Sequence, residues 1–278
     1  MKPWVQVWLN GSMYKMDGYK EGKLMKTMQV RNVTLGEGMP KICVPIVGVS
    51  KAEIIRQAEE INLLEADLVE WRADWFENVM DLDQVCTVLS ELRNILEDMP
   101  ILFTFRTANE GGEREISIKD YSSLNLTVAK NKAADLIDIE AFLDEEVVGE
   151  LIQTIQKYGV YVITSNHDFK KTPEKEEIIR RLMKMQEIGA DVIKIAVMPL
   201  CKQDVLTLLS ATLEMNEKYA NKPVVTMSMA ADGSISRMTG EVFGSALTFG
   251  AAKKVSAPGQ LEVGELKQVL EIIHKGLQ

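Results

Sequence analysis

The stretch VYVITSNHDFKKTPEKEEIIRRLMKMQEIGADVIKIAV, residues 160–197, decides the fold of this chain. It opens with a strand-like run of apolar and β-branched residues at 160–167 and closes with a second such run at 191–197. The segment between the two runs has apolar residues at a helical spacing, namely Ile178, Leu182 and Met185. A strand, a helix and a second strand in this order predict one βαβ unit of a parallel sheet.

The same alternation continues in both directions along the chain. Further strand-like runs occur at 41–47, 67–72, 101–106, 135–140 and 223–228, and a less distinct one at 251–257. Amphipathic helical segments separate them without a Pro/Gly/Ser-rich linker. Eight such units predict an α/β fold, the (β/α)8 or TIM barrel, whose typical length of about 250 residues also fits. An open doubly wound sheet is the alternative, but no G-x-G-x-x-G motif follows the first strand.

The pattern divides the chain into one domain and an extension. Residues 28–278 form a single predicted barrel domain, and its first segment, 28–38, has the pattern of a β-hairpin that we expect to close the bottom of the barrel. Residues 1–27 precede the first unit. We expect them to be an N-terminal extension, either disordered or foreign to the folded domain, whose removal leaves the fold intact.

Composition and charge exclude several classes of protein. The 278 residues carry 32 Lys+Arg against 41 Asp+Glu, a net charge of −9. No apolar stretch reaches the roughly 18–20 residues that span a bilayer, and no cluster of basic residues offers a surface for a phosphate backbone. We therefore expect neither a membrane nor a nucleic acid as partner. Three distant cysteines, Cys43, Cys86 and Cys201, predict buried structural thiols in a reducing, cytoplasmic compartment.

Five predicted strands place polar residues after apolar ones on the same face. Residues two apart in a strand share a face. The sets are Leu68, Glu70 and Arg72; Leu102, Thr104 and Arg106; Leu136, Asp138 and Glu140; Ile163, Ser165 and His167; and Val192, Lys194 and Ala196. If these faces point inward, the polar members converge at the mouth of the barrel, where barrel enzymes have their active sites. Solvated strand ends, or charge neutralisation between neighbours such as Glu70 and Arg72, are the alternative explanation.

Lys194 and His167 are the strongest candidates for chemistry. Lys194 lies among apolar neighbours, and desolvation lowers the pKa of a lysine, whose neutral amine can attack a carbonyl and form a Schiff base. A lysine whose ammonium extends out of the strand end to water is the alternative. His167 ends the preceding strand and is suited to move protons near neutral pH. The other histidine, His274, is expected at the surface, and a lone histidine at the mouth argues against a metal site.

Five segments resemble the type I 3-dehydroquinate dehydratase family. They are EWRADWFE (70–77), LFTFRTANEGGE (102–113), SNHDFKKTP (165–173), IKIAVMP (193–199) and EVFGSALTFGAAKKVSAPGQ (241–260). The resemblance covers residues 28–278 and implies the same barrel, usually as a homodimer. It also implies a small-molecule substrate, 3-dehydroquinate, which a lyase of the shikimate pathway converts to 3-dehydroshikimate without a metal or other cofactor.

The resemblance assigns roles residue by residue. Lys194 matches the Schiff-base lysine, His167 the general acid/base and Glu110 the carboxylate that orients this histidine. Arg237 and Ser256 match the residues that contact the substrate carboxylate. The groups that hold the ring hydroxyls and close the site match Glu70, Arg72, Arg106 and Gln260. Pro45 departs from the family pattern, which often has a serine that can touch substrate, so that hydrogen bond is in doubt.

Two other functions fit part of the pattern. A lysine-iminium aldolase or transaldolase would need a phosphate site after the seventh and eighth strands. Residues 229–237, which we predict to form a flexible loop that orders over bound substrate, offer one arginine there, which suits a carboxylate equally well. A barrel that only binds a metabolite would be expected to lack Lys194 or His167, and both are present.

Overall fold

The computed structural model describes residues 5–9, 12–16, 26–252 and 261–278. Two short hairpins precede the main sheet: β1 (Val5–Leu9) pairs with β2 (Ser12–Met16), and β3 (Met28–Val30) pairs with β4 (Val33–Leu35), both antiparallel. The second confirms the hairpin predicted at 28–38. The assignment of residues 1–27 to a dispensable extension stays a prediction.

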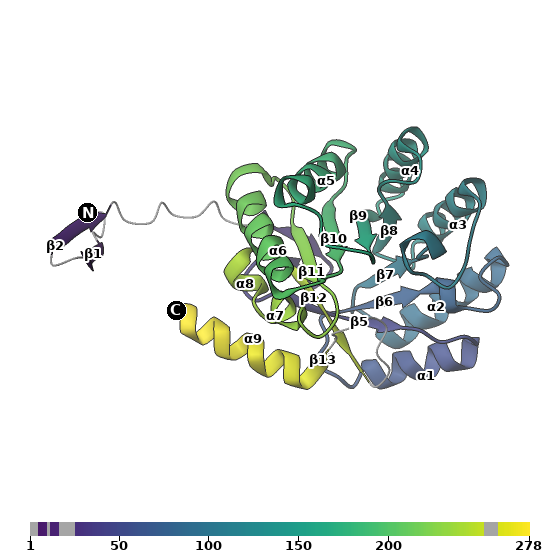
Figure 1. Cartoon of the computed structure of the whole chain (residues 1–278). Coiled ribbons are helices and arrows are strands. Elements are labelled where there is room, and N and C mark those ends of the chain that lie inside the picture. The colour runs from purple at the N-terminus through teal and green to yellow at the C-terminus, as the bar shows by residue number, and fades with distance from the viewer. Residues whose placement is uncertain (1–4, 10–11, 17–25, 253–260) are drawn as a thin grey trace.

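A parallel sheet of eight consecutive strands curls into a barrel in the described part of the chain (Figure 1). The strands are β5 (Lys41–Ile46), β6 (Leu68–Arg72), β7 (Ile101–Thr104), β8 (Leu136–Glu140), β9 (Tyr161–Asp168), β10 (Val192–Val197), β11 (Val224–Ser228) and β12 (Leu247–Ala251). β12 pairs with β5, and the Ala246 N–H donates to the Val224 carbonyl at the β11 edge, 2.7 Å away. The predicted (β/α)8 barrel is confirmed.

Helices cover the outside of this barrel. The long ones are α1 (Lys51–Ile61), α2 (Leu82–Leu96), α3 (Ile118–Asn131), α4 (Glu145–Lys157), α5 (Lys175–Glu187), α6 (Lys202–Glu214) and α9 (Val263–Leu277). Short elements complete the chain: the 3-10 turns η1 (Ala73–Trp75) and η2 (Ala108–Glu110), the π-turn η3 (Met215–Tyr219), α7 (Ser234–Met238), α8 (Gly240–Phe243) and β13 (Leu261–Glu262).

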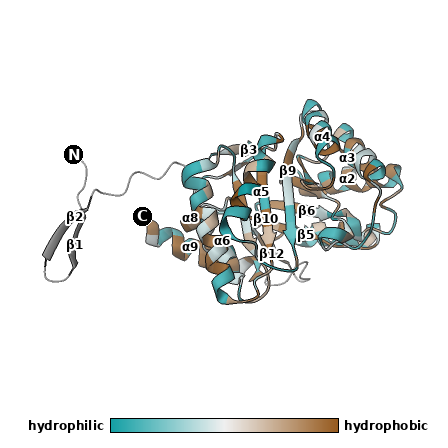
Figure 2. Cartoon of the chain, turned by 45° about the horizontal axis from the view of Figure 1, so that its top comes forward, coloured by the Kyte–Doolittle hydropathy of each residue, from teal (hydrophilic) through white to brown (hydrophobic). Residues whose placement is uncertain are grey.

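Local sequence explains where several helices begin. Four of them follow a residue whose side-chain oxygen accepts a hydrogen bond from the backbone N–H three residues on, which satisfies one of the free donors of the first turn. These N-cap residues are Ser50, Asp81, Ser117 and Asp144. Hydrophilic and hydrophobic residues alternate along the outer helices, as expected of helices with one face in water (Figure 2).

The burial predicted for all three cysteines is correct for Cys43, but Cys86 is half-buried and Cys201 is exposed. Two predictions about local structure were also wrong. The eighth strand was expected at 251–257, but β12 covers Leu247–Ala251, because Leu247 and Phe249 supply the inward face that fills the barrel. Most of the predicted range, 253–257, lies outside the described residues. The predicted loop at 229–237 contains α7, whose Ser236 hydroxyl donates to the Gly233 carbonyl and accepts from the Ser228 N–H.

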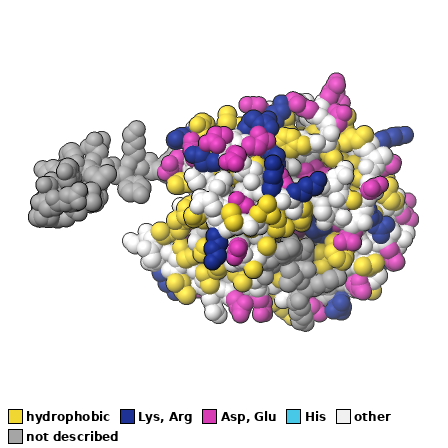
Figure 3. Space-filling model, in the orientation of Figure 1, with side chains coloured by type: hydrophobic (Ala, Val, Ile, Leu, Met, Phe, Trp, Pro, Cys, Tyr) yellow, Lys and Arg dark blue, Asp and Glu magenta, His cyan; other side chains and the backbone are white. Residues whose placement is uncertain are grey.

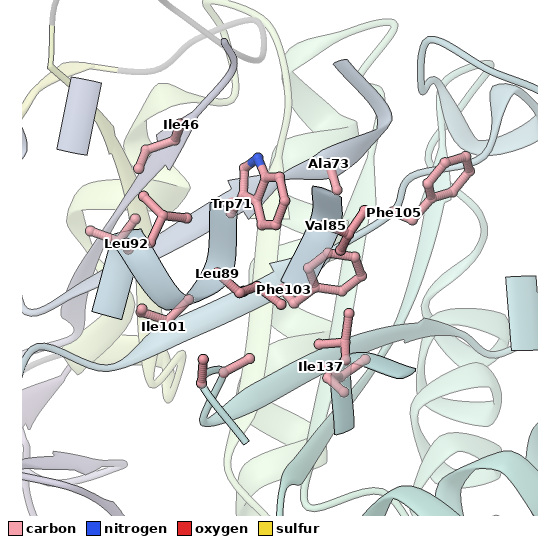
Figure 4. Packing of buried hydrophobic residues seen from close by; sticks show 14 of the residues in the cluster. Ile46, Trp71, Ala73, Val85, Leu89, Leu92, Ile101, Phe103, Phe105 and Ile137 are labelled. Carbon is pink, nitrogen blue, oxygen red and sulfur yellow. The ribbon is translucent and has the colours of Figure 1, made fainter. Parts of the chain in front are cut away.

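The core forms two layers. Between sheet and helices, Val85, Leu89 and Leu92 of α2 pack against strand residues such as Trp71 and Phe103 (Figure 4). Inside the barrel, a second cluster combines the inward apolar residues predicted above, including Leu68, Leu102, Leu136, Ile163 and Val192.

The β3–β4 hairpin closes the bottom of the barrel, as predicted. Val30, Val33 and Leu35 are buried and belong to the same cluster as the apolar residues at the strand starts. The Arg31 guanidinium pairs with Asp135, which directly precedes β8. The polar strand ends therefore face the opposite, open end. Among the described residues, no helix has both the length and the apolar character that crossing a membrane would require.

Candidate active site

A cavity of about 220 Å³ opens at the carboxyl ends of the barrel strands. Its volume is below the roughly 300–1,000 Å³ of drug-sized ligand pockets and fits a small metabolite. The structure brings seven of the nine predicted site residues to its wall: Glu70, Arg72, Arg106, Glu110, His167, Lys194 and Arg237. The other two, Ser256 and Gln260, lie outside the described residues.

Lys194 lies on β10 with its side chain inside the barrel, and it is 3% exposed. Its Nζ atom is 3.3 Å from Asp138 Oδ2 and 3.8 Å from Glu70 Oε1, and it lies over the ring of Phe249, 4.6 Å from the centroid. Two carboxylates and the face of an aromatic ring therefore surround the Lys194 nitrogen. The prediction that Lys194 points into an enclosed setting is confirmed, although that setting is charged as well as apolar.

His167 and Glu110 form a close pair. Adjacent pairing of β9 with β10 puts His167 beside Ala196 and Ser165 beside Lys194, so the histidine and the lysine share one wall. The His167 Nδ1 atom is 2.9 Å from Glu110 Oε2, and the His167 backbone N–H donates to the same oxygen. The second ring nitrogen, Nε2, is left for the cavity.

Burial sets the protonation of this pair. Burial, helped by the charges of Arg106, Lys194 and Arg72, lowers the pKa of His167 well below its ordinary value, so the ring is neutral at pH 7. Burial also raises the pKa of Glu110 to about 8, although the charge of Arg106 opposes the change. A neutral imidazole can accept a proton from a bound substrate.

Arg72 is held by a carboxylate that the sequence analysis did not single out. Its Nε and Nη2 atoms each donate to one oxygen of Asp74, both at 2.8 Å, in the bidentate geometry that fixes a guanidinium most firmly. Asp74 is fully buried and also accepts from the backbone N–H groups of Arg106 and Glu113. Its position two residues after a strand-end arginine was the only sequence feature that could have indicated it.

Arg106 connects three strands below the cavity. Its guanidinium donates to Asp138 Oδ1 at 2.8 Å, to Glu140 Oε1 at 2.9 Å and to Ser165 Oγ at 3.0 Å. All these groups are buried. The inward faces of β8 and β9 were predicted from the sequence, but these three residues were not assigned a role.

Arg237 approaches the cavity from α7, beyond β11. It is 2% exposed, and its Nη1 atom lies 3.8 Å from Met227 Sδ. Burial lowers the pKa of its guanidinium to about 10. The wall around it is apolar, made by Met227, Met229, Phe249 and the ring of Phe169. One side of the cavity is therefore charged and polar, and the other is apolar and suits the carbon skeleton of a small ligand.

The donor set does not resemble a metal site. Among the described residues, no three His, Cys, Asp or Glu side chains gather in a way that could hold a metal ion. The buried carboxylates behind the cavity wall are paired with arginines and a lysine instead. The expectation that no metal or other cofactor takes part stays a prediction.

Comparison with known proteins identifies relatives over most of the chain. The family model of type I 3-dehydroquinase matches residues 42–276. A protein of Bacillus licheniformis named 3-dehydroquinate dehydratase is 58% identical over 254 residues, which cover 91% of this chain and 100% of the relative. One of Clostridium novyi with the same name is 57% identical over 91% of this chain and all of its own length.

Solved structures agree with these relatives. The crystal structure of type I 3-dehydroquinate dehydratase from Clostridium difficile, with covalently modified comenic acid, superimposes with a TM-score of 0.88 at 54% identity, over 91% of this chain and 99% of that one. The enzyme from Geobacillus kaustophilus gives the same TM-score at 36% identity, over 91% and 98% of the two chains.

Proposed function

Because the chain belongs to the type I 3-dehydroquinase family, we propose that it dehydrates 3-dehydroquinate to 3-dehydroshikimate, a step of the shikimate pathway, through a Schiff base on Lys194. The observation that carries the proposal is the shared wall of β9 and β10. It brings an enclosed lysine and a neutral histidine to one small cavity that also contains arginines.

The reaction needs an electron sink for the carbanion that forms when C2 loses its proton. The amine of Lys194 condenses with the C3 ketone, and the resulting iminium makes the C2 proton acidic. His167 accepts this proton through Nε2, while Glu110 holds the Nδ1 side of the ring. The enamine then expels the C1 hydroxyl, to which His167 returns the proton, and water leaves. Hydrolysis of the imine releases the product, so the covalent bond supplies the electron sink and no other cofactor is required.

The charged wall explains how the ring would be held. Arg237 is placed for bidentate contact with the substrate carboxylate, with Ser256 beside it by family resemblance. Glu70, Arg72 and Arg106 lie where they can bind ring hydroxyls, and Gln260 would close the site. The structure of the Clostridium difficile relative was solved with covalently modified comenic acid, which agrees with covalent chemistry in this family.

Borohydride trapping tests the central claim. Borohydride reduces an imine to a stable amine, so enzyme treated with 3-dehydroquinate and borohydride should carry the adduct mass on the peptide that contains Lys194. Lys194→Met should lose both the adduct and the formation of the conjugated enone product. Lys170→Met is the matched control, because Lys170 lies in the exposed turn after β9, close to the cavity but outside its wall. An adduct on another lysine would refute the mechanism.

We also propose that two copies of the chain associate as a homodimer in the cytoplasm. Hydrophobic side chains gather over α6 and α8 on the face shown in Figure 3. The exposed apolar residues of these two helices are Leu206 and Leu213 of α6 and Val242 of α8, which are 57%, 38% and 43% exposed. Neighbouring α6 and α8 could bury them against a second copy. Sedimentation equilibrium should give twice the chain mass, and Leu206→Asp should shift it towards the monomer. A monomeric parent protein would contradict this proposal.

A further inference from the structure

A carboxylate that does not line the cavity holds the Nζ atom of Lys194 from below. Asp138 lies on β8, is 0% exposed and is absent from the cavity wall. Its Oδ1 atom accepts from Ser165 Oγ at 2.6 Å and from Arg106 Nη2 at 2.8 Å. Its Oδ2 atom faces Lys194 Nζ at 3.3 Å. Two donors on one oxygen therefore fix the direction of the other.

The contact between Asp138 and Lys194 matters because the Lys194 nitrogen is charged on both sides of imine formation. Two of the three ammonium protons leave with the ketone oxygen as water, so a net charge of +1 stands beside Asp138 both before the reaction, as ammonium, and after it, as iminium. We propose that Asp138 is a catalytic residue, the fixed counter-charge that orients the Lys194 nitrogen and stabilises the iminium formed there. This inference rests on the Schiff base proposed above.

Asp138 fits this role better than Glu70, the other nearby carboxylate. Glu70 Oε1 is farther from Nζ, at 3.8 Å, and accepts a hydrogen bond from Thr104. Glu70 also lines the cavity, where substrate can contact it. Asp138 is shielded from substrate and water, and a charge pair in such a low-dielectric setting is stronger than one in water.

The protonation of Asp138 agrees with a permanent counter-charge. Burial alone would raise its pKa, but the charges of Arg106 and Lys194 and the hydrogen bond from Ser165 outweigh burial, so its pKa is lowered. Other titratable and charged groups also lie around Lys194, on the elements that pack against β10 or line the cavity. They are Cys43 on β5, Glu70 and Arg72 on β6, Arg106 after β7, Glu110 on η2, Glu140 on β8, His167 on β9 and Arg237 on α7.

The test removes the charge of Asp138 and keeps its size. In Asp138→Asn, the apparent pKa of the Lys194 amine should fall by about one unit or more, the usual effect of an opposite charge at this distance. It is measured without substrate, as the pH dependence of acetylation of the Lys194 peptide by acetic anhydride. The fraction of enzyme trapped by borohydride after a short, fixed time at saturating 3-dehydroquinate should fall about tenfold, because an amine that Asp138 no longer orients attacks the ketone more slowly.

Glu140→Gln is the matched control. Glu140 lies two residues further along β8, is equally buried and also pairs with Arg106, but the two carboxylates within 4.0 Å of Lys194 Nζ are Asp138 and Glu70. Its loss should move the acetylation midpoint of Lys194 by less than about half a unit, because charge interactions weaken with distance. Equal shifts in the two variants, or no shift in Asp138→Asn, would overturn the inference.

Two further variants keep the test decisive. Asp138→Glu retains the charge and should recover most of the trapped fraction. Should Asp138→Asn fail to fold, Ser165→Ala removes the hydrogen bond that directs Asp138, together with the one that Ser165 accepts from Arg106. It should lower the trapped fraction about threefold, and an unchanged fraction would count against the role. Wild-type adduct on another lysine would instead refute the Schiff base itself, so the two failures are distinguishable.

Discussion

Glu110 joins the turn after β7 to the end of β9. Its two oxygens accept from Asn166 Nδ2 and from the His167 backbone N–H, both at 2.9 Å. Burial raises its pKa from an ordinary 4.5 to about 8. Between these two values the folded protein retains a proton that the unfolded chain releases, so the free energy of unfolding falls as pH rises through this window.

Glu110→Gln should remove this part of the pH dependence. We expect the variant to gain on the order of 1–2 kcal/mol over the wild type between pH 6.5 and 8, a window above the ordinary pKa of histidine. His167, whose pKa is lowered, adds only a small slope of opposite sign near pH 6.5, which is the same in both proteins. Urea unfolding at several pH values measures the effect, and the exposed Glu59→Gln is the control. Parallel stability curves for Glu110→Gln and wild type would contradict the prediction.

The buried carboxylate of Asp74 holds the guanidinium of Arg72 in position. Asp74→Asn keeps the size of the side chain but leaves the guanidinium of Arg72 without its bidentate partner. Breaking a buried pair on one side costs on the order of 3 kcal/mol of unfolding free energy. If Arg72 binds a ring hydroxyl as proposed, KM should also rise, by about tenfold for about 1.4 kcal/mol of lost binding.

An exposed pair with the same geometry provides the comparison for Asp74. Glu177 accepts from Arg180 Nε and Nη2 at 2.7 and 2.8 Å, but Arg180 is at the surface. Exposed ion pairs contribute little because water screens them. Glu177→Gln should therefore cost less stability than Asp74→Asn and leave KM unchanged. Urea denaturation and steady-state kinetics of both variants measure these effects. Equal losses of unfolding free energy would show that burial does not explain the cost of Asp74→Asn.

At the scale of elements, one glycine allows two loops to touch. Gly111 ends η2 with φ +84°, and a Cβ atom there would lie 2.3 Å from the ring of Phe169, in the turn after β9. The bare Cα therefore lets the turn that carries Glu110 pack against the turn that follows His167. Phe169 also forms part of the cavity wall.

Gly111→Ala should displace one of these loops. The left-handed backbone alone costs about 1–2 kcal/mol for an alanine, and the collision with Phe169 adds to it. Gly159→Ala isolates the backbone cost, because Gly159 has φ +81° and open space around its Cα. Gly111→Ala should thus lose more stability than Gly159→Ala, and Phe169→Ala should remove the excess. Additive losses in the double variant would show that the ring contact has no energetic effect.

For the complete chain, we expect the fold to require the β3–β4 hairpin but not the segment before it. Relatives at 53–58% identity are covered over their full length by 91% of this chain, so about a tenth of it has no counterpart in them. A chain that starts at Met28 should therefore melt within about 2 °C of the full chain and turn over equally fast.

Removing the hairpin as well should have a large effect. A chain that starts at Glu37 loses the buried Val30, Val33 and Leu35, each worth about 1.5–3 kcal/mol. The melting temperature should then fall by about 10 °C or more, at roughly 2–4 °C per kcal/mol. Leu35→Ala is the milder variant and should fall between the two truncations. Thermal denaturation followed by circular dichroism measures all three, and a stable chain from Glu37 would contradict the closing role of the hairpin.

The barrel and the inward faces of its strands could be predicted from the amino-acid pattern alone. The period of two along a strand is a property of the pleated backbone, so Lys194, Ser165 and Asp138 could be assigned to the interior from spacing alone. The family resemblance added Glu110 and Arg237, which lie outside the strands and follow no such period. The boundary of β12 was misplaced, because a run of small residues and lysines carries little periodic information.

The pairing of the polar groups and the directions of their pKa shifts could be read only from the folded structure. His167 meets Glu110 from 57 residues away, and Lys194 meets Asp138 from 56. Asp74 forms its ion pair with Arg72, not with the guanidinium of Arg106. The pKa of Glu110 rises because burial by neighbouring strands removes water from its carboxyl group. Partner choice and pKa depend on distances through space and on burial, which arise only when the strands close into a barrel, whereas the period of a strand is present in any few consecutive residues.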